Sequence, residues 1–197
     1  LDSGALYRAV TLYAMEHGMV REDGSIDKDA LVAALKDIDI HFEYSPEGSH
    51  TFIGDQCVDS QIRTLAVSSH VSPVAVIPQV RNFVDELLVS YGKNGRIVMD
   101  GRDIGTSVFP NADLKIFMVA DDKVRAQRRL NEMVAGGQNP DFQEVLENLK
   151  SRDYIDSHRE TSPLRQAEDA VVLDNSDMTL QDQMVWIKKL VEERFGK

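Results

Sequence analysis

The segment DGRDIG, residues 100–105, is the first candidate for a chemically active site because it places Arg102 between two aspartates. An arginine guanidinium is a planar fork that binds a phosphate or a carboxylate through two parallel hydrogen bonds. The two glycines allow the backbone to turn closely around a ligand. Arg102 could therefore bind a phosphate while Asp103 orients it or accepts a hydrogen bond from a ligand amine. An arginine–aspartate pair that only stabilises a turn is the alternative, but such a pair is unfavourable at a strand end unless both charges are satisfied, which favours a ligand site.

Two other groups of residues have the types and spacing of an anion site. Ser3 and Arg8 lie at the start of an expected helix, where a hydroxyl group, free backbone N–H groups and a cation meet. An ordinary helix N-cap with a solvated arginine is the alternative. The second group is Arg125, Arg128 and Arg129, whose charges lie on neighbouring helix positions and repel one another unless a multiply charged anion neutralises them. A basic, solvated helix face is the alternative there.

The segment SRDYIDSHR, residues 151–159, contains a row of alternating charges. Arg152, Asp156 and Arg159 follow steps of four and three residues, so they share one face of a helix. Such a row can bind a phosphate through its arginines while the aspartate binds sugar hydroxyl groups or holds an arginine in place. A surface ladder of salt bridges is the alternative, and the segment by itself does not decide between the two.

The composition of the 197 residues excludes several classes of protein. A net charge of −11 argues against a protein that binds nucleic acid irrespective of sequence, because such a protein needs a basic face. No apolar run approaches the ~18–20 residues that cross a bilayer, and Cys57, the single cysteine, can form no disulfide within the chain, so we expect a cytoplasmic protein. The five histidines have no metal-ligand spacing and none pairs with Cys57, which leaves zinc and Cys–His chemistry without support.

The pattern of apolar residues predicts an α/β fold that positions these segments. Helices are expected over residues 5–17, 28–36, 78–92, 122–135, 141–159 and 180–195, with a weaker helical pattern over 61–75. Strands are expected over 96–99, 114–119 and 170–173, and an antiparallel hairpin or meander over 38–60. Strands that alternate with helices form parallel sheets, and ligands bind at the carboxyl ends of their strands. The DGRDIG segment follows the first of these strands, which places it at such an end.

Taken together, these segments resemble the bacterial cytidylate kinases, which are nucleoside monophosphate kinases of the P-loop fold. The resemblance covers essentially the whole chain, and its motifs, in the order and spacing of the family, are LDSGALYR, SQIRTLAVSSHVSPVAVIPQVR, MDGRDIGTSVFPNADLKIFM, RAQRR, SRDYIDSHRETSPL and DAVVLDNSDMTL. It implies a three-layer α/β fold with a parallel sheet between flanking helices, a small antiparallel β insert and a helical lid. The implied regions are a core of residues 1–27, 78–120 and 160–197, a monophosphate-binding region of residues 28–77 with the insert at about 38–60, and a lid of residues 121–159.

The resemblance further implies transfer of the γ-phosphoryl group of ATP to CMP or dCMP, with Mg²⁺ accompanying ATP and no metal ligand in this chain. The implied CMP-binding residues are Ser3, Arg8 and Arg102 at the monophosphate, Ser72, Arg81 and Asp103 at the cytosine, and Arg152 and Asp156 at the ribose. Arg159 lies near the transferring phosphoryl group, so that Arg102, Arg152 and Arg159 form the catalytic set. The implied ATP-side residues are Arg125, Arg128 and Arg129 of the lid and Asn175 and Ser176 near the ATP base. The implied protein is a cytoplasmic monomer whose partners are nucleotides, with neither nucleic acid nor membrane among them.

One element of the family pattern does not occur within residues 1–197. The family has a Gly-x-x-x-x-Gly-Lys loop upstream of the LDSG motif, which binds the phosphates of ATP and supplies a hydroxyl group near Mg²⁺. We therefore expect that residues 1–197 alone are not a competent kinase and that an N-terminal segment precedes Leu1 in the intact protein. A kinase for another nucleoside monophosphate and a non-catalytic nucleotide-binding module are the alternatives.

Overall fold

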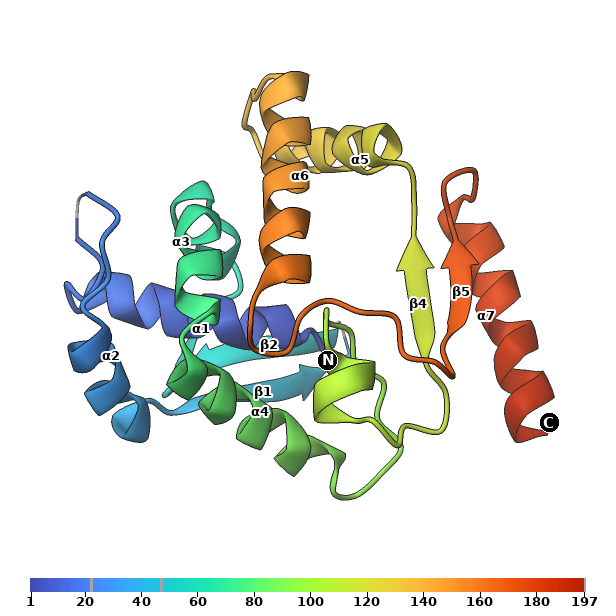
Figure 1. Cartoon of the computed structure of the whole chain (residues 1–197), viewed down its shortest axis with the longest axis horizontal. Helices are drawn as coiled ribbons and strands as arrows, with labels where there is room; N and C mark the ends of the chain where they lie inside the picture. Colours follow the sequence, from blue (N-terminus) through green and yellow to red (C-terminus); the bar gives the residue numbers. More distant parts are fainter. Residues whose placement is uncertain (22, 47, 197) are drawn as a thin grey trace.

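The structure combines a mainly helical body with two small sheets (Figure 1). It is a computed structural model that describes residues 1–21, 23–46 and 48–196. In chain order, the helices and turns of helix are α1(Ser3–Glu16), α2(Lys28–Ala34), η1(Leu35–Asp37), η2(Gln61–Arg63), α3(Leu65–Ala75), α4(Pro78–Gly92), η3(Ile104–Val108), α5(Asp122–Ala135), α6(Phe142–His158) and α7(Leu180–Phe195). The strands are β1(Ile40–Ser45), β2(Gly48–Ile53), β3(Gln56–Cys57), β4(Ile116–Val119) and β5(Val171–Asp174).

Helix α1 is the centre of the main hydrophobic core. Small and apolar residues, among them Leu6, Ala9 and Val10, fill its sequence and are fully buried. Helices α3 and α4 and the hairpin of β1 and β2 all contact α1. The burial of these side chains removes apolar surface from water and is the main stabilising contribution to this part of the fold. It holds the amino end of α1 near the middle of the molecule (Figure 1).

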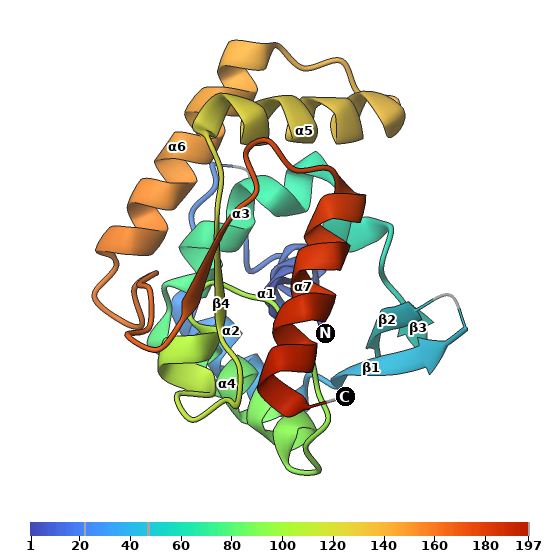
Figure 2. The same ribbon diagram turned by 90° about the vertical axis from the view of Figure 1, so that its right-hand side faces the viewer.

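The strands form one antiparallel and one parallel sheet. In the antiparallel sheet, of order β1-β2-β3, Ile40 pairs with Ile53 and Phe52 pairs with Cys57, so the predicted antiparallel insert is confirmed. In the parallel sheet, β4 and β5 pair from Ile116 with Val171 onwards. Helix α7 lies beside this sheet (Figures 1 and 2). The predicted α/β class, with a parallel sheet, a β insert and flanking helices, is therefore confirmed.

The strand predicted over residues 96–99 is wrong. Among the described residues, this segment leads only into a single parallel bridge between Asp2 and Asp100, and Val98 is 88% exposed. The bridge is parallel, so the positions opposite residues 96–98 lie before residue 1, and the ladder extends no further back than the bond from the Leu1 amine to the Val98 carbonyl at 2.7 Å. Strands β4 and β5 form as predicted, but they are less buried than a core strand would be, since Met118 is 54% exposed.

Helices α5 and α6 form a pair above the rest of the molecule (Figure 1). A small apolar cluster of Ala126, Val145 and Leu146 joins the two helices, and α6 also contacts α3. Asp121 and Asp141 cap them, because each carboxylate accepts hydrogen bonds from the first free backbone N–H groups of its helix. None of the helices in the described ranges is both long and apolar enough to cross a membrane. The division of the chain into core, monophosphate-binding and lid regions stays a prediction.

Candidate functional site

The amino end of α1 and the loop around Gly101 are joined by backbone hydrogen bonds. The Asp100 N–H donates to the Leu1 carbonyl at 2.9 Å, and the Ser3 N–H donates to the Asp100 carbonyl at 3.0 Å. Asp2 rather than Ser3 is the N-cap of α1, since its carboxylate accepts from the Ala5 N–H at 3.3 Å. The sequence prediction that Ser3 caps this helix is therefore wrong by one residue. Ser3 is instead the first residue of the helix and is buried against the loop.

Gly101 allows this close approach because it has no β-carbon. A β-carbon at this position would overlap the hydroxyl oxygen of Ser3 and the side chain of Ile104. The absence of a side chain at residue 101 therefore permits the Arg102 loop to lie against the start of α1.

Replacing Gly101 with alanine should destabilise the protein by about 1–3 kcal/mol, the usual cost of overpacking. The free energy of unfolding in urea measures this effect. Gly105→Ala is the matched control in the same loop, because the nearest atom to its added β-carbon is Lys115 Cδ at 3.2 Å, on a flexible side chain that can move. Equal effects of the two substitutions would contradict the steric role of Gly101.

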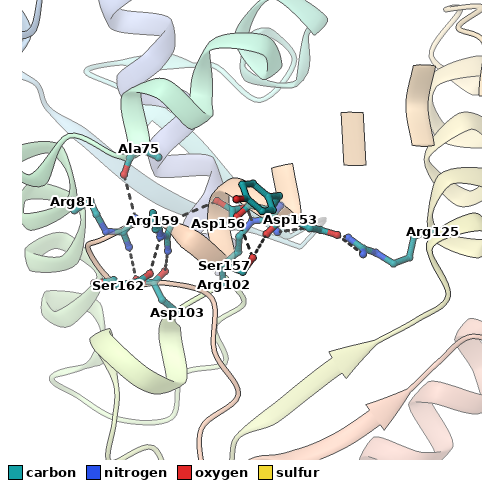
Figure 3. Close-up of polar contacts among 11 residues, drawn as sticks. Ala75, Arg81, Arg102, Asp103, Arg125, Asp153, Asp156, Ser157, Arg159 and Ser162 are labelled. Carbon is teal, nitrogen blue, oxygen red and sulfur yellow. Dashed lines mark hydrogen bonds and ion pairs between the residues drawn. The ribbon is translucent and has the colours of Figure 1, made fainter. Parts of the chain in front are cut away.

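Asp103 lies between two buried arginines (Figure 3). Arg81 on α4 donates from Nη2 to the Asp103 carboxylate and from Nη1 to the Ala75 carbonyl at 3.2 Å. Arg159, which caps the C-terminal end of α6, has its Nη2 3.2 Å from Asp103 Oδ1. Three segments that are far apart in sequence, α4, the loop before η3 and the end of α6, thus meet at one carboxylate. Buried charges of this kind are tolerated only when they are paired.

The surroundings of this group shift several pKa values. Burial lowers the pKa of the Arg159 guanidinium and neighbouring Arg81 acts in the same direction, against Asp103. Burial also raises the pKa of Asp85, which lies one helical turn after Arg81, and it raises the pKa of Tyr7 above its ordinary range. The Arg81 guanidinium carbon is 5.3 Å from the centre of the Tyr7 ring, within the range of a cation–π contact. The sequence analysis missed Tyr7 and Asp85, although the four-residue spacing between Arg81 and Asp85 was a usable signal.

A row of alternating charges continues from Asp103 to helix α5 (Figure 3). Asp156 lies 3.5 Å from Arg159 Nη1 and 2.6 Å from Arg102 Nε. Asp153 lies 3.7 Å from Arg102 Nη1, and it accepts two hydrogen bonds from Arg125 at 2.6 and 3.1 Å. We call these residues the charge row: Arg81, Asp103, Arg159, Asp156, Arg102, Asp153 and Arg125. Asp153 belongs to the SRDYIDSHR segment singled out from the sequence but received no role there, although its three-residue spacing from Asp156 places both on one helix face.

Four arginines of the predicted site keep a buried N–H group that has no hydrogen-bond partner among the described residues. These groups are Arg8 Nε, Arg81 Nε, Arg152 Nε and Arg159 Nη2. Native structures satisfy the large majority of their buried polar groups, so each exception requires an explanation. With the hydroxyl group of Tyr7, which also lacks a partner in the described part of the chain, these four arginine donors point to an anionic or strongly hydrogen-bonding ligand.

Arg152 carries the clearest signal for an anion. No carboxylate in the described part of the chain lies within ion-pair distance of it, whereas Arg8 has Asp2 as its partner at 2.5 Å. Burial lowers the pKa of Arg152, and the nearby cations Arg102, Arg129 and Arg8 lower it further, against Asp156. Repulsion by neighbouring cations destabilises a buried cation, and a bound anion offsets this repulsion. The structure thus brings Arg8, Arg102 and Arg152 together, as the sequence predicted.

The three lid arginines point to different partners. Arg125 binds Asp153, and Arg128 donates to the side-chain and backbone oxygens of Asn175 at 3.0 and 2.6 Å. Arg129 pairs with exposed Glu132 at 3.2 Å and also lies close enough to Arg152 to lower its pKa. Partners within the protein therefore neutralise Arg125, and carbonyl oxygens satisfy Arg128. Arg125 and Arg128 therefore do not require a bound anion to offset the repulsion that the sequence suggested among the three arginines.

The remaining predicted residues lie near the site or at its edge. Asn175 is buried and donates to Gln183 at 3.1 Å, while Ser176 accepts from the Asp121 N–H at the start of α5. This loop is thus tied to the base of the lid. Ser72 is half-buried on α3, the helix that contacts α6. Their roles toward a nucleotide stay predictions.

The carboxylates of Asp2 and Asp100 lie near each other at the start of α1. Burial raises the pKa of Asp100, and the negative charge of Asp2 raises it further. Arg8, which pairs with Asp2 at 2.5 Å, acts on the pKa of Asp100 in the opposite direction.

The sequence of this chain matches known proteins over nearly its whole length. The profile of the family described as "Cytidylate kinase" matches residues 1–193. A cytidylate kinase of Bacteroides thetaiotaomicron is 49% identical over 100% of this chain and 85% of its own length. Cytidylate kinases of Phocaeicola vulgatus and Flavobacterium psychrophilum are 50% and 45% identical, over 95% and 97% of this chain and 82% and 85% of their own lengths. This chain belongs to the cytidylate kinase family.

Proposed function

We propose that this protein transfers the γ-phosphoryl group of ATP to CMP or dCMP and so forms CDP or dCDP together with ADP. The observation that carries the proposal is the group of buried arginine N–H donors without partners, with Arg152 lacking any counter-ion among the described residues. A nucleoside monophosphate offers such a site both a dianionic phosphate and hydrogen-bonding sugar and base groups. The family membership and the relatives named cytidylate kinase support this choice of reaction.

The roles of individual residues follow from their positions in the cluster. Arg8, Arg102 and Ser3 would bind the monophosphate, because the Arg102 loop lies directly against the start of α1. Arg152 and Asp156 would bind the ribose, and the charge of Arg152 would also act on the transferring phosphoryl group. Arg81 and Asp103, with Ser72 nearby, would form the cytosine side. Arg159 would stabilise the transferring phosphoryl group through its guanidinium, whose Nη2 pairs with Asp103 but makes no hydrogen bond with it. Phosphoryl transfer requires positioning, charge neutralisation and exclusion of water more than covalent chemistry, and guanidinium groups supply the first two.

The lid and the metal complete the proposed mechanism. Helices α5 and α6 would close over ATP and exclude water, with Arg125, Arg128 and Arg129 on that side and Asn175 and Ser176 near the ATP base. Mg²⁺ would accompany ATP and neutralise charge on the ATP phosphates when it is bound. We further propose that the protein acts as a monomer in the cytoplasm, where its nucleotide substrates are available.

An acceptor assay tests the proposal on the full-length protein, including any residues that precede Leu1. With ATP and Mg²⁺, we expect kcat/KM for CMP or dCMP to exceed that for AMP and UMP by about tenfold or more, since a site that hydrogen-bonds one base leaves buried groups unpaired with another. A clear preference for AMP or UMP would contradict the proposal. Tight binding of CMP without any transfer would point instead to a nucleotide-binding module.

A further inference from the structure

The outer face of the antiparallel sheet carries a histidine, a cysteine and an aspartate together. The register pairs Phe52 with Cys57, and the Val58 N–H donates to the Thr51 carbonyl at 2.9 Å, which continues the same register. His50 therefore lies opposite Asp59, and Cys57 is their diagonal neighbour. Paired residues and residues two apart share one face of a sheet. The opposite face, with Thr51 and Val58, is buried in the core.

The donor atoms of these three side chains are close enough to share one ion. One atom each from His50, Cys57 and Asp59 lies within 4.8 Å of the other two, and His50 Nδ1 is 2.9 Å from Asp59 Oδ2. Zinc binds sulfur at about 2.3 Å and nitrogen or oxygen at about 2.0–2.2 Å, so donors on one zinc ion lie roughly 3–4 Å apart. Small side-chain rotations are enough to bring the three donors to these separations.

Two further contacts fix the orientation of the His50 and Asp59 side chains. Ser45 Oγ lies 2.9 Å from His50 Nε2, and His50 Nδ1 lies 2.9 Å from Asp59 Oδ2. In the tautomer in which Nε2–H donates to the Ser45 hydroxyl group, the Nδ1 lone pair is available to a metal ion that takes the place of the contact between Nδ1 and Asp59. The Thr51 N–H donates to Asp59 Oδ1 at 2.9 Å and leaves Oδ2 facing His50. Outer contacts of this kind orient metal ligands in known sites.

We propose that His50, Cys57 and Asp59 bind a zinc ion, with water in the fourth position. A thiolate and a carboxylate together neutralise the charge of Zn²⁺, and an imidazole and a thiolate select zinc over Mg²⁺ and Ca²⁺, which prefer oxygen ligands. The proton of the Cys57 thiol is released to solvent on binding. This site is independent of the proposed kinase reaction, since it lies on the hairpin, well away from helix α6, which carries part of the charge row (Figure 2).

Metal titration of the full-length protein, first stripped with a chelator, tests this site. We expect one Zn²⁺ per chain by calorimetry, and with Co²⁺ a near-ultraviolet thiolate-to-metal absorption band. Within residues 1–197 that band can come only from Cys57, the single cysteine. Cys57→Ser should abolish the band, and Cys57→Ser, His50→Gln and Asp59→Asn should each weaken zinc binding by about tenfold or more. An excess of Mg²⁺ should not displace the zinc.

His17→Gln is the matched control, because His17 is an exposed histidine at the end of α1 and should leave zinc affinity unchanged. Circular dichroism of each metal-free variant checks that it is folded, and phosphoryl transfer at saturating substrate should be unchanged in Cys57→Ser. Zinc affinity that stays the same in all three ligand variants, or a Co²⁺ complex without the thiolate band, would overturn the proposal.

Discussion

Replacing Arg152 with alanine should lower kcat/KM for CMP by about 10²–10³-fold, the usual loss when one charged donor to a transition state is removed. The same change should leave the protein at least as stable as before. Arg152 has no ion-pair partner in the described part of the chain, and its neighbours Arg102, Arg129 and Arg8 repel it. Its removal therefore relieves this repulsion and leaves no carboxylate without an ion-pair partner. Steady-state kinetics with CMP and the free energy of unfolding in urea measure the two effects.

Arg165→Ala is the control for this experiment. Arg165 is an exposed arginine in the segment that follows α6, and its removal should change neither quantity appreciably. Arg152→Lys should recover part of the activity, because it restores the charge without the planar fork. A loss of several kcal/mol of stability in Arg152→Ala would show that Arg152 is a structural residue. Unchanged kcat/KM for CMP would show that Arg152 is not part of the substrate site.

At Asp103 we expect the opposite pattern, in which a substitution mainly lowers the free energy of unfolding. Asp103→Asn leaves Arg81 and Arg159 buried without their shared counter-ion. Breaking a buried pair from one side costs about 3–5 kcal/mol, which is a large part of the stability of an ordinary domain. Urea unfolding at neutral pH measures the loss.

Asp169→Asn is the matched control for Asp103→Asn. Asp169 also pairs with a cation, Lys115 at 2.8 Å, but its carboxylate is 63% exposed. Exposed pairs contribute about 0–1 kcal/mol, so this substitution should cost much less than the one at Asp103. Similar losses from the two substitutions would show that the Asp103 group is not a buried ionic centre. Restored stability in Arg81→Met combined with Asp103→Leu would support it further.

The sequence predicted which residues share a helix face, because that depends on local geometry. The steps of four and three between Arg152, Asp156 and Arg159 predicted one face, and the structure places the first two on α6 and the third at its C-cap. Near the chain start the prediction missed by one residue, because Asp2 and Ser3 are both good capping residues. Only the backbone bonds to Asp100, nearly a hundred residues away, decide between them.

Contacts between distant segments could not be read from the sequence. The partners of Arg125 and Arg128 lie 28 and 47 residues away, so the apparent excess of positive charge on α5 was only local. The same holds for His50 and Cys57, whose seven-residue separation matches no metal motif until the register of β2 and β3 brings them to one face. For the segment over residues 96–99, apolar composition predicted a strand, but a strand also requires a partner of matching length.

The alternation of the charge row has an evolutionary consequence. Each interior member touches an opposite charge on both sides, so the loss of any one of them unbalances two neighbours at once. Single replacements inside this row are therefore selected against more strongly than at an isolated ion pair. Among descendants of this gene, Arg102 and Asp156 should either persist unchanged or be exchanged jointly.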